Sequence, residues 1–318
     1  MKRLNLVLLL CLFTSLVWAK DLTPKFGFQA KGGVTDLVVN NNKLYVATKA
    51  SSVDVFNIST TLKESSITLP QIEDFMGDII DSKIYSIDVL ENRVLIVSQG
   101  VKGGRNIDIY ENGKLTNIIS DKKRYFIAKA KFVTPTKILF SLLSNQLYFF
   151  DIKTNKSIYV KQVSQSKFSD FVLNEKKDMV IVTDESGDLQ LINVKDGHMQ
   201  TTLSGQNLDN VFQLDWKNNT ILTAGQDRRA VVYTTMNSKP YYKKSTFLIY
   251  SCALSPKGEV GAYSSDEENN VTVFNTRTNS DLYKLTQNKM TLTKMVFLNE
   301  KEILVASDDN VVNFYKLQ

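Results

Sequence analysis

Hydrophobic and polar residues alternate along short segments through most of the chain. Segments such as Asp188–Ile192 and Asn270–Phe274 place apolar side chains at every second position, which is the pattern of half-buried β-strands. β-branched residues are common in these segments and proline is scarce. Because no long amphipathic helix follows the first nineteen residues, the pattern predicts an all-β protein made of short strands.

These strands recur with a regular period. Each repeat contains a strand that closes on an aromatic or large apolar residue, and the seven closing residues are Phe56, Tyr110, Phe150, Ile192, Tyr233, Phe274 and Phe314. The intervals between them are 54, 40, 42, 41, 41 and 40 residues. A period near 41 residues that is built of strands is typical of the four-stranded blades of a β-propeller, whereas helical solenoids show 3.6-residue periodicity. The pattern therefore predicts one seven-bladed β-propeller domain over residues 20–318.

The last repeat is predicted to be completed by the beginning of the domain. The sequence stops at Gln318, directly after the third predicted strand of that repeat. The segment Leu22–Ala30, which precedes the first full repeat, is expected to supply the missing fourth strand. Such pairing would close the ring and remove a free sheet edge. We expect the loss of either terminus to destabilise the whole ring.

Two turns carry a resemblance to a known family. Asp227 precedes the closing Tyr233 by six residues, and Asp308 precedes the closing Phe314 by six. In the WD40 family of propellers an Asp occupies this place in a tight turn before a closing Trp, so the chain resembles that family with an aromatic ring in place of Trp. No repeat has the family's Trp-Asp closer, and none has the Gly-His pair that completes the family's buried hydrogen-bonding network. The resemblance implies a WD40-like architecture, in which both carboxylates are expected to accept hydrogen bonds from the turn backbone.

The first nineteen residues differ in character from the rest. Lys2 and Arg3 precede an apolar run of twelve residues that ends at Val17, and Ala19 is a small residue before Lys20. This is the pattern of a secretory signal peptide over residues 1–19, cleaved after Ala19. An uncleaved membrane anchor is the alternative, but the run is too short to span about 30 Å of hydrocarbon.

Cysteine and charge content narrow the setting further. Leu10 before Cys11 is not small, which disfavours a lipoprotein, and after cleavage Cys252 is the only cysteine left. A chain without disulfides suits a Gram-negative periplasm better than an extracellular eukaryotic setting, and Cys252 is expected to be a buried, inert thiol. Cleavage lowers the net charge from +6 to +4, which does not indicate nucleic-acid binding. We therefore expect a periplasmic protein with no stable membrane insertion.

Candidate catalytic and metal-binding motifs are few. His198 is the only histidine and is expected in an exposed turn, so neither a multi-ligand zinc or copper site nor a Cys-His nucleophile pair is supported. The acidic run Asp266–Asn270 lacks the spacing and glycine of a calcium loop. The sequence thus predicts a protein that is not an enzyme and has no cofactor. A quinone-cofactor propeller dehydrogenase is the alternative, disfavoured by the single Trp that remains after cleavage, Trp216.

Loops on one predicted face supply the candidate binding residues. In a propeller, the loops that join strand two to strand three, and one blade to the next, emerge on the same face. Repeats two and three place basic residues there, namely Lys102, Arg105, Lys122, Lys123 and Arg124. Repeats four, six and seven place acidic residues there, namely Asp184, Glu185, Asp266, Glu267, Glu268, Asp308 and Asp309. Opposed sectors of charge would orient a protein partner; the alternative is ordinary solvated turns.

The longest interval between closing residues points to the same face. It contains Pro70–Asp81, which joins the first repeat to the second and carries Phe75 and Met76 beside acidic residues. Insertions in regular repeats often lie on the binding face, and an aromatic residue with Met is the kind of anchor that interfaces use. The alternative is that the segment folds down and fills a gap between blades.

Overall size, signal and repeat style carry a second, more specific resemblance. In these features the chain resembles the WD40-type accessory propellers of periplasmic nitrate reductase clusters, the NapL family. This resemblance implies a non-catalytic scaffold that assists the maturation of, or electron delivery to, a molybdenum-containing nitrate reductase through protein contact. An outer-membrane assembly scaffold is a further alternative, disfavoured because such propellers are usually tethered by a lipid.

Overall fold

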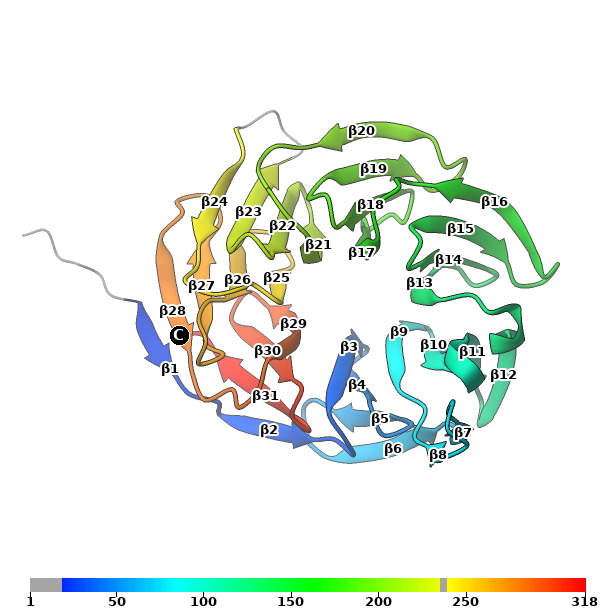
Figure 1. The fold of residues 1–318 in the computed structure, drawn as a ribbon. Coiled ribbons are helices and arrows are strands. Elements are labelled where there is room, and N and C mark those ends of the chain that lie inside the picture. Colours follow the sequence, from blue (N-terminus) through cyan, green and yellow to red (C-terminus); the bar gives the residue numbers. More distant parts are fainter. Residues whose placement is uncertain (1–18, 235–238) are drawn as a thin grey trace, which may run out of the picture.

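The structure, a computed structural model, describes residues 19–234 and 239–318. Seven antiparallel sheets are arranged around a central axis, each with its first strand innermost (Figure 1). All seven closing residues lie on the third strands of their sheets. The predicted all-β, WD40-like seven-bladed propeller is therefore confirmed. The predicted signal peptide lies, apart from Ala19, outside the described residues.

The blades follow one another along the chain, each contributing strands in sequence order from the inside outward. Blade 1 comprises β3 (Val34–Asn40), β4 (Lys43–Thr48), β5 (Ser52–Asn57) and β6 (Lys63–Thr68). Blade 2 comprises β9 (Ile84–Leu90), β10 (Arg93–Gln99), β11 (Arg105–Glu111) and β12 (Lys114–Ile119). Blade 3 comprises β13 (Ile127–Thr134), β14 (Lys137–Leu142), β15 (Gln146–Asp151) and β16 (Lys156–Gln162). Blade 4 comprises β17 (Phe168–Leu173), β18 (Met179–Asp184), β19 (Leu189–Asn193) and β20 (Met199–Leu203).

The remaining blades keep the same plan. Blade 5 comprises β21 (Val211–Lys217), β22 (Thr220–Gly225), β23 (Arg229–Thr234) and β24 (Tyr241–Lys244). Blade 6 comprises β25 (Cys252–Leu254), β26 (Val260–Ser264), β27 (Val271–Asn275) and β28 (Asp281–Leu285). Blade 7 comprises β29 (Leu292–Asn299), β30 (Glu302–Ser307) and β31 (Val311–Lys316), and is completed by a strand from the beginning of the domain.

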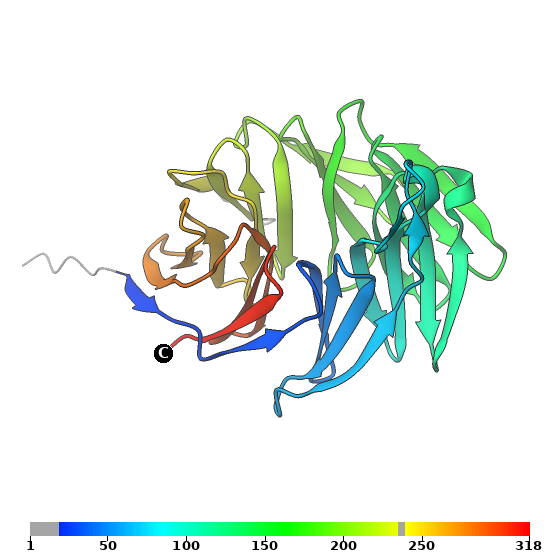
Figure 2. The same ribbon diagram turned by 60° about the horizontal axis from the view of Figure 1, so that its bottom comes forward.

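That closing strand is β2 (Phe26–Gln29), which pairs antiparallel with β31 and places Phe28 opposite Val312. The expected closure by Leu22–Ala30 is thus confirmed. A second contact was not expected from the sequence: β1 (Lys20–Leu22) pairs in parallel with β28 and adds a fifth strand to blade 6. Figure 2 shows this N-terminal segment running along the outer edges of the last blades, beside the C-terminal strand. The beginning of the domain therefore ties two blades together.

Apolar side chains fill the spaces between neighbouring blades. Trp216, for example, is buried with Ile181 of blade 4 and Val231 of blade 5, so its ring packs between the two blades. Burying an aliphatic or aromatic side chain of this size contributes roughly 1.5–3 kcal/mol. Because each sheet packs on both neighbours, the stability of any blade depends on the closed ring.

Aspartates on the inner strands join four pairs of adjacent blades. Each accepts a backbone N–H from the inner strand of the next blade: Asp36 from Ile87 at 3.0 Å, Asp88 from Phe132 at 2.8 Å, Asp170 from Leu214 at 3.2 Å and Asp215 from Leu254 at 2.9 Å. A carboxylate so placed satisfies backbone donors that no strand pairing reaches. These residues were not singled out from the sequence.

Candidate interaction surface

The insertion between blades 1 and 2 forms a short hairpin. Its strands are β7 (Ile72–Glu73) and β8 (Ile79–Ile80). In the turn, Asp74 Oδ1 accepts hydrogen bonds from the backbone N–H of Met76 at 2.8 Å and of Asp78 at 3.0 Å, and Gly77 adopts a positive φ of 88° that favours glycine. This turn holds Phe75 76% exposed and Met76 86% exposed.

The expected exposure of these two anchors is confirmed. The alternative, in which the insertion folds down to fill a gap between blades, is wrong for both side chains. The hairpin contacts the 3-10 turn η1 (Val101–Gly103), which joins the second and third strands of blade 2. The candidate residues from the insertion and from blade 2 therefore share one part of the molecule (Figure 1).

Two turns of blade 2 brace each other beneath this hairpin. The second, η2 (Asp121–Lys123), leads into blade 3. Asp121 Oδ2 accepts the backbone N–H of Val101 at 2.8 Å, and Gly104 lies so close that a Cβ there would come within 2.5 Å of the Asp121 carbonyl oxygen. The absence of a side chain at Gly104 permits this approach. The surface is thus built on hydrogen-bonded turns anchored to strands.

Five exposed apolar side chains gather on these turns. Phe75 and Phe126 approach the same glycine: a Cβ at Gly103 would lie 3.3 Å from the Phe75 ring and 3.9 Å from the Phe126 ring. Phe126 is 52% exposed, and Ile79 and Val101 are also exposed. We call this group the rim patch, which comprises Phe75, Met76, Ile79, Val101 and Phe126. Clustered exposed apolar side chains commonly mark interaction sites.

Sequence reasoning found Phe75 and Met76 and missed the other three. Phe126 directly precedes β13, where the alternating pattern would place an apolar residue inside the sheet. Val101 lies within a turn, and a single apolar residue there carries no pattern. Only the packing of the hairpin against blade 2 brings these side chains together.

Exposed cations flank the rim patch. Lys102 lies in η1, Lys122 and Lys123 lie in η2, and Arg124 follows them with a left-handed backbone at φ 52°. Within residues 19–234 and 239–318, none of the four forms an ion pair. Their charges are therefore available to an acidic partner.

Arg105 does not belong to this exposed group, which corrects the sequence-based prediction. Its guanidinium lies 3.7 Å from the centre of the Tyr85 ring and donates from Nη1 to the carbonyl oxygen of Ile127 at 2.7 Å. Burial lowers the pKa of this side chain. Arg105 therefore bridges blades 2 and 3, because its planar group stacks on an aromatic ring while reaching a backbone acceptor.

The predicted acidic sector is also corrected. Asp184 is fully buried and accepts hydrogen bonds from Asn145, Ser164 and Ser186. Several of the others form ion pairs, namely Glu185 with Lys167, Asp266 with Lys284, Asp308 with Lys49 and Asp309 with Lys289. Much of the acidic sector is therefore compensated within the chain, whereas the cations beside the rim patch are not.

The two WD40-like turn aspartates differ from each other. Asp227 accepts the backbone N–H of Leu208 at 2.8 Å and of Arg229 at 3.0 Å, so the expected capping role is confirmed. Asp308 instead reaches across to blade 1 and pairs with Lys49 at 2.7 Å. The expected backbone capping is not seen there, because this carboxylate is drawn to a cation of the neighbouring blade.

Other candidate groups take the positions expected of them. His198 is exposed in the turn between β19 and β20, and Cys252 is buried. Asp266 closes the acidic turn by accepting hydrogen bonds from Asn270. The described part of the chain contains no group of three or more His, Cys, Asp or Glu side chains arranged to hold a metal ion. Nor does any helix among these residues have the length and apolar character to cross a membrane.

Asp108 makes the stability of blade 2 depend on pH. This carboxyl lies on β11, where burial raises its pKa to about 6, against the hydrogen bond from Asn117. The native state therefore binds more protons than the unfolded state between about pH 4 and pH 6, so this group's contribution to stability falls as pH rises through that window. Above about pH 6, the ionised Asp108 lowers the free energy of unfolding.

Asp108→Asn is accordingly expected to raise the free energy of unfolding at pH 8 by about 3 kcal/mol. The gain should shrink toward zero at about pH 3, where the wild-type carboxyl is neutral in both states. Urea unfolding of both proteins at several pH values measures this difference. An equal gain at pH 5 and pH 8 would contradict the explanation.

Comparisons with known proteins support the fold alone. No protein-family model matches the chain, and no curated protein matches it. Among solved structures it is similar to the β-propeller domain of Cps50 (Swd1) from Myceliophteria thermophila, with a TM-score of 0.75 and 13% sequence identity. The match covers 93% of this chain and 99% of that domain. The chain thus has the fold of a seven-bladed, WD40-like β-propeller.

Proposed function

We propose that this protein is a non-catalytic periplasmic scaffold that holds a protein partner at the rim patch. In this proposal it is an accessory factor of a periplasmic respiratory enzyme, such as nitrate reductase, in maturation or electron delivery, as its resemblance to the NapL family implies. The observation that carries the proposal is the exposed apolar cluster on braced turns, flanked by cations that form no ion pair with any residue the structure describes.

The composition of the patch suits a protein contact. Aromatic and Met side chains are enriched where interfaces are buried, and a few such anchors supply most of the binding energy, at 2 kcal/mol or more each. Phe75 and Met76 are the most exposed side chains of the rim patch. Lys102, Lys122, Lys123 and Arg124 would speed encounter with an acidic surface and fix its orientation.

Reversing the charge at the flanking cations tests the proposal. The triple substitution Lys122→Glu, Lys123→Glu and Arg124→Glu is expected to weaken retention of the partner about tenfold or more at low salt, while the thermal midpoint stays within a few degrees because all three side chains are exposed. Retention of nitrate reductase components from periplasmic extract on the immobilised protein measures the effect.

A matched control separates this surface from charge in general. Lys153, Lys156 and Lys176 are exposed lysines of blades 3 and 4, and reversing all three changes the net charge by the same amount. This control should retain the partner as the wild type does. If both triple variants retain it equally, the basic residues beside the rim patch are ordinary solvated surface and the proposal fails.

A further inference from the structure

A cavity of about 340 Å³ lies in the central opening of the ring. It is lined by the C-terminal ends of inner strands, such as β17 at Leu173 and β21 at Lys217. The rim patch lies on the loops that lead into the inner strands, so the two features occupy opposite faces of the propeller. A ligand in this cavity would therefore not contact a protein partner bound at the rim patch.

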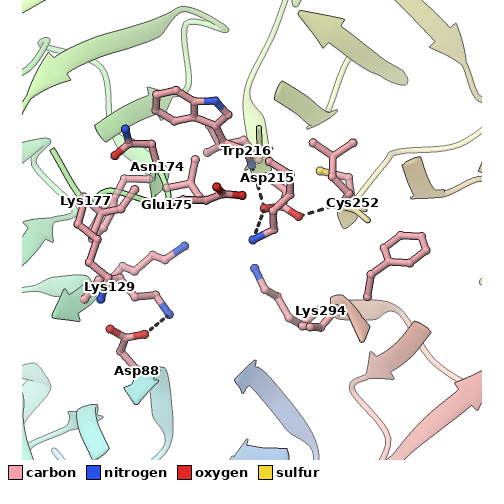
Figure 3. A pocket seen from close by; sticks show the side chains of 18 of the residues that line it. Asp88, Lys129, Asn174, Glu175, Lys177, Asp215, Trp216, Cys252 and Lys294 are labelled. Atoms are coloured by element: carbon pink, nitrogen blue, oxygen red, sulfur yellow. Dashed lines mark hydrogen bonds and ion pairs between the residues drawn. The ribbon is translucent and has the colours of Figure 1, made fainter. Parts of the chain in front are cut away.

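Five lysines from four blades line the cavity: Lys129, Lys131, Lys177, Lys217 and Lys294. Figure 3 shows Lys129 and Lys294 approaching the same space from opposite sides. The carboxylates in the lining are fewer, namely Asp88, Glu175 and Asp215. Like charges brought together at a partly closed site are unfavourable unless something compensates them.

Two of these carboxylates, Asp88 and Asp215, already accept hydrogen bonds from the backbone. Asp88 Oδ2 accepts the backbone N–H of Phe132 at 2.8 Å. Asp215 accepts the N–H of Trp216 at 2.8 Å on one oxygen and that of Leu254 at 2.9 Å on the other. The bonds from Phe132 and Leu254 join adjacent blades. The two carboxylates also lie near cavity lysines, Asp88 at 3.6 Å from Lys131 and Asp215 at 3.8 Å from Lys217, so neither is left free to compensate Lys294 by a direct contact.

Lys294 is the least satisfied of the cations. Among the described residues, its ammonium has no hydrogen bond or ion pair, whereas Lys129 lies 2.6 Å from Asp170 and Lys177 donates to the Phe132 carbonyl at 2.8 Å. Burial opposes the charge of Lys294, but attraction from Asp170, Asp36 and Asp215 outweighs it and raises the pKa. An ammonium carries three donors, and the Lys294 ammonium lines the cavity with no acceptor for them among the described residues.

We propose that this cavity binds a small multivalent oxyanion of the phosphate class, with Lys294 as its principal ligand. The several oxygens of such an anion can accept hydrogen bonds from lysines on different blades at once, and lysine is a common phosphate ligand that acts as a compact charge. The cavity is large enough for phosphate with a small organic group, at the lower end of the ~300–1,000 Å³ usual for ligand sites. Trp216 and Phe297 in the lining offer apolar surface to such a group.

Calorimetric titration of the purified protein with inorganic phosphate, and separately with glycerol 3-phosphate, tests this proposal. The ionic strength is held constant with sodium chloride. We expect one binding event per chain, weakened about tenfold or more by Lys294→Met, because a hydrogen bond to a charged group is lost. Lys289→Met, which removes an exposed lysine outside the cavity, should leave the affinity unchanged.

A second variant shows whether weaker binding could result from unfolding of the Lys294→Met protein. Lys217 is more exposed than the other lysines that form ion pairs in the cavity, and Lys217→Met should also weaken binding while its thermal midpoint without phosphate matches that of the wild type. Competition by sulfate would agree with oxyanion recognition. The proposal is overturned if millimolar phosphate gives no binding, if chloride competes as well as sulfate, or if neither cavity variant weakens the binding observed.

Discussion

Replacing Asp170 by alanine is expected to lower the free energy of unfolding by about 3–5 kcal/mol. This carboxylate is buried on the inner strand of blade 4 and accepts the backbone N–H of Phe171 at 2.9 Å and of Leu214 at 3.2 Å. It also pairs with Lys129 of blade 3 at 2.6 Å. One substitution would thus leave a cation without its ion-pair partner and two backbone donors unpaired, at the junction of three blades.

A surface ion pair of the same blade provides the control. Glu185 pairs with Lys167 at 3.4 Å with both side chains about half exposed, so Glu185→Ala should cost less than about 1 kcal/mol. Adding Lys129→Met to Asp170→Ala should recover part of the loss, because the uncompensated charge is removed. Urea unfolding of the wild type, Asp170→Ala, Glu185→Ala and the double variant measures these differences in the free energy of unfolding. A cost below about 1 kcal/mol for Asp170→Ala would mean that the inter-blade carboxylates contribute little.

Phe28→Ala is expected to cost about 3–5 kcal/mol. Phe28 lies on the closing strand β2, is 1% exposed, and packs edge-on against Phe26 and against Phe56 of blade 1. Its loss would open a cavity between blades 7 and 1, where the ring closes, and would loosen the strand that covers the edge of β31. Hydrogen exchange should accordingly increase first in β31 and β2.

An exposed phenylalanine serves as the matched control. Phe126 lies in the rim patch, and Phe126→Ala should change the free energy of unfolding by less than about 1 kcal/mol while it weakens partner binding. Thermal and chemical unfolding of the two variants give the comparison. Equal costs for Phe28→Ala and Phe126→Ala would contradict the importance assigned to ring closure.

The sequence was sufficient to predict the propeller because the fold repeats a local pattern. Seven closing residues at nearly constant spacing determine the blade count, and the missing strand of the last repeat points to Leu22–Ala30. The parallel pairing of β1 with β28 could not be predicted in this way, since Lys20–Leu22 is too short to carry a pattern. The inner-strand aspartates also escaped notice, because alternation alone does not distinguish a solvated carboxylate from one that bonds to the next blade.

The surface was predicted less completely, for a physical reason. Loop assignment puts a charged residue on a face but does not show what it contacts. Arg105 and Asp184 were assigned to loops, but they begin β11 and end β18, where they are held by Ile127 and by Asn145. Conversely, Phe126 joins the rim patch only through the folding of a distant hairpin against Gly103.

Site-specific photocrosslinking tests most directly whether the rim patch holds a protein partner. A photoreactive residue placed at Met76 should give one discrete adduct in the periplasm of the source cells, and mass spectrometry should identify a component of a respiratory enzyme. The adduct should disappear when Lys122, Lys123 and Arg124 are changed to Glu. The same probe at Ile158, an exposed residue of the outer strand β16, should give none. No adduct at Met76, or the same adducts at both positions, would contradict the proposed function.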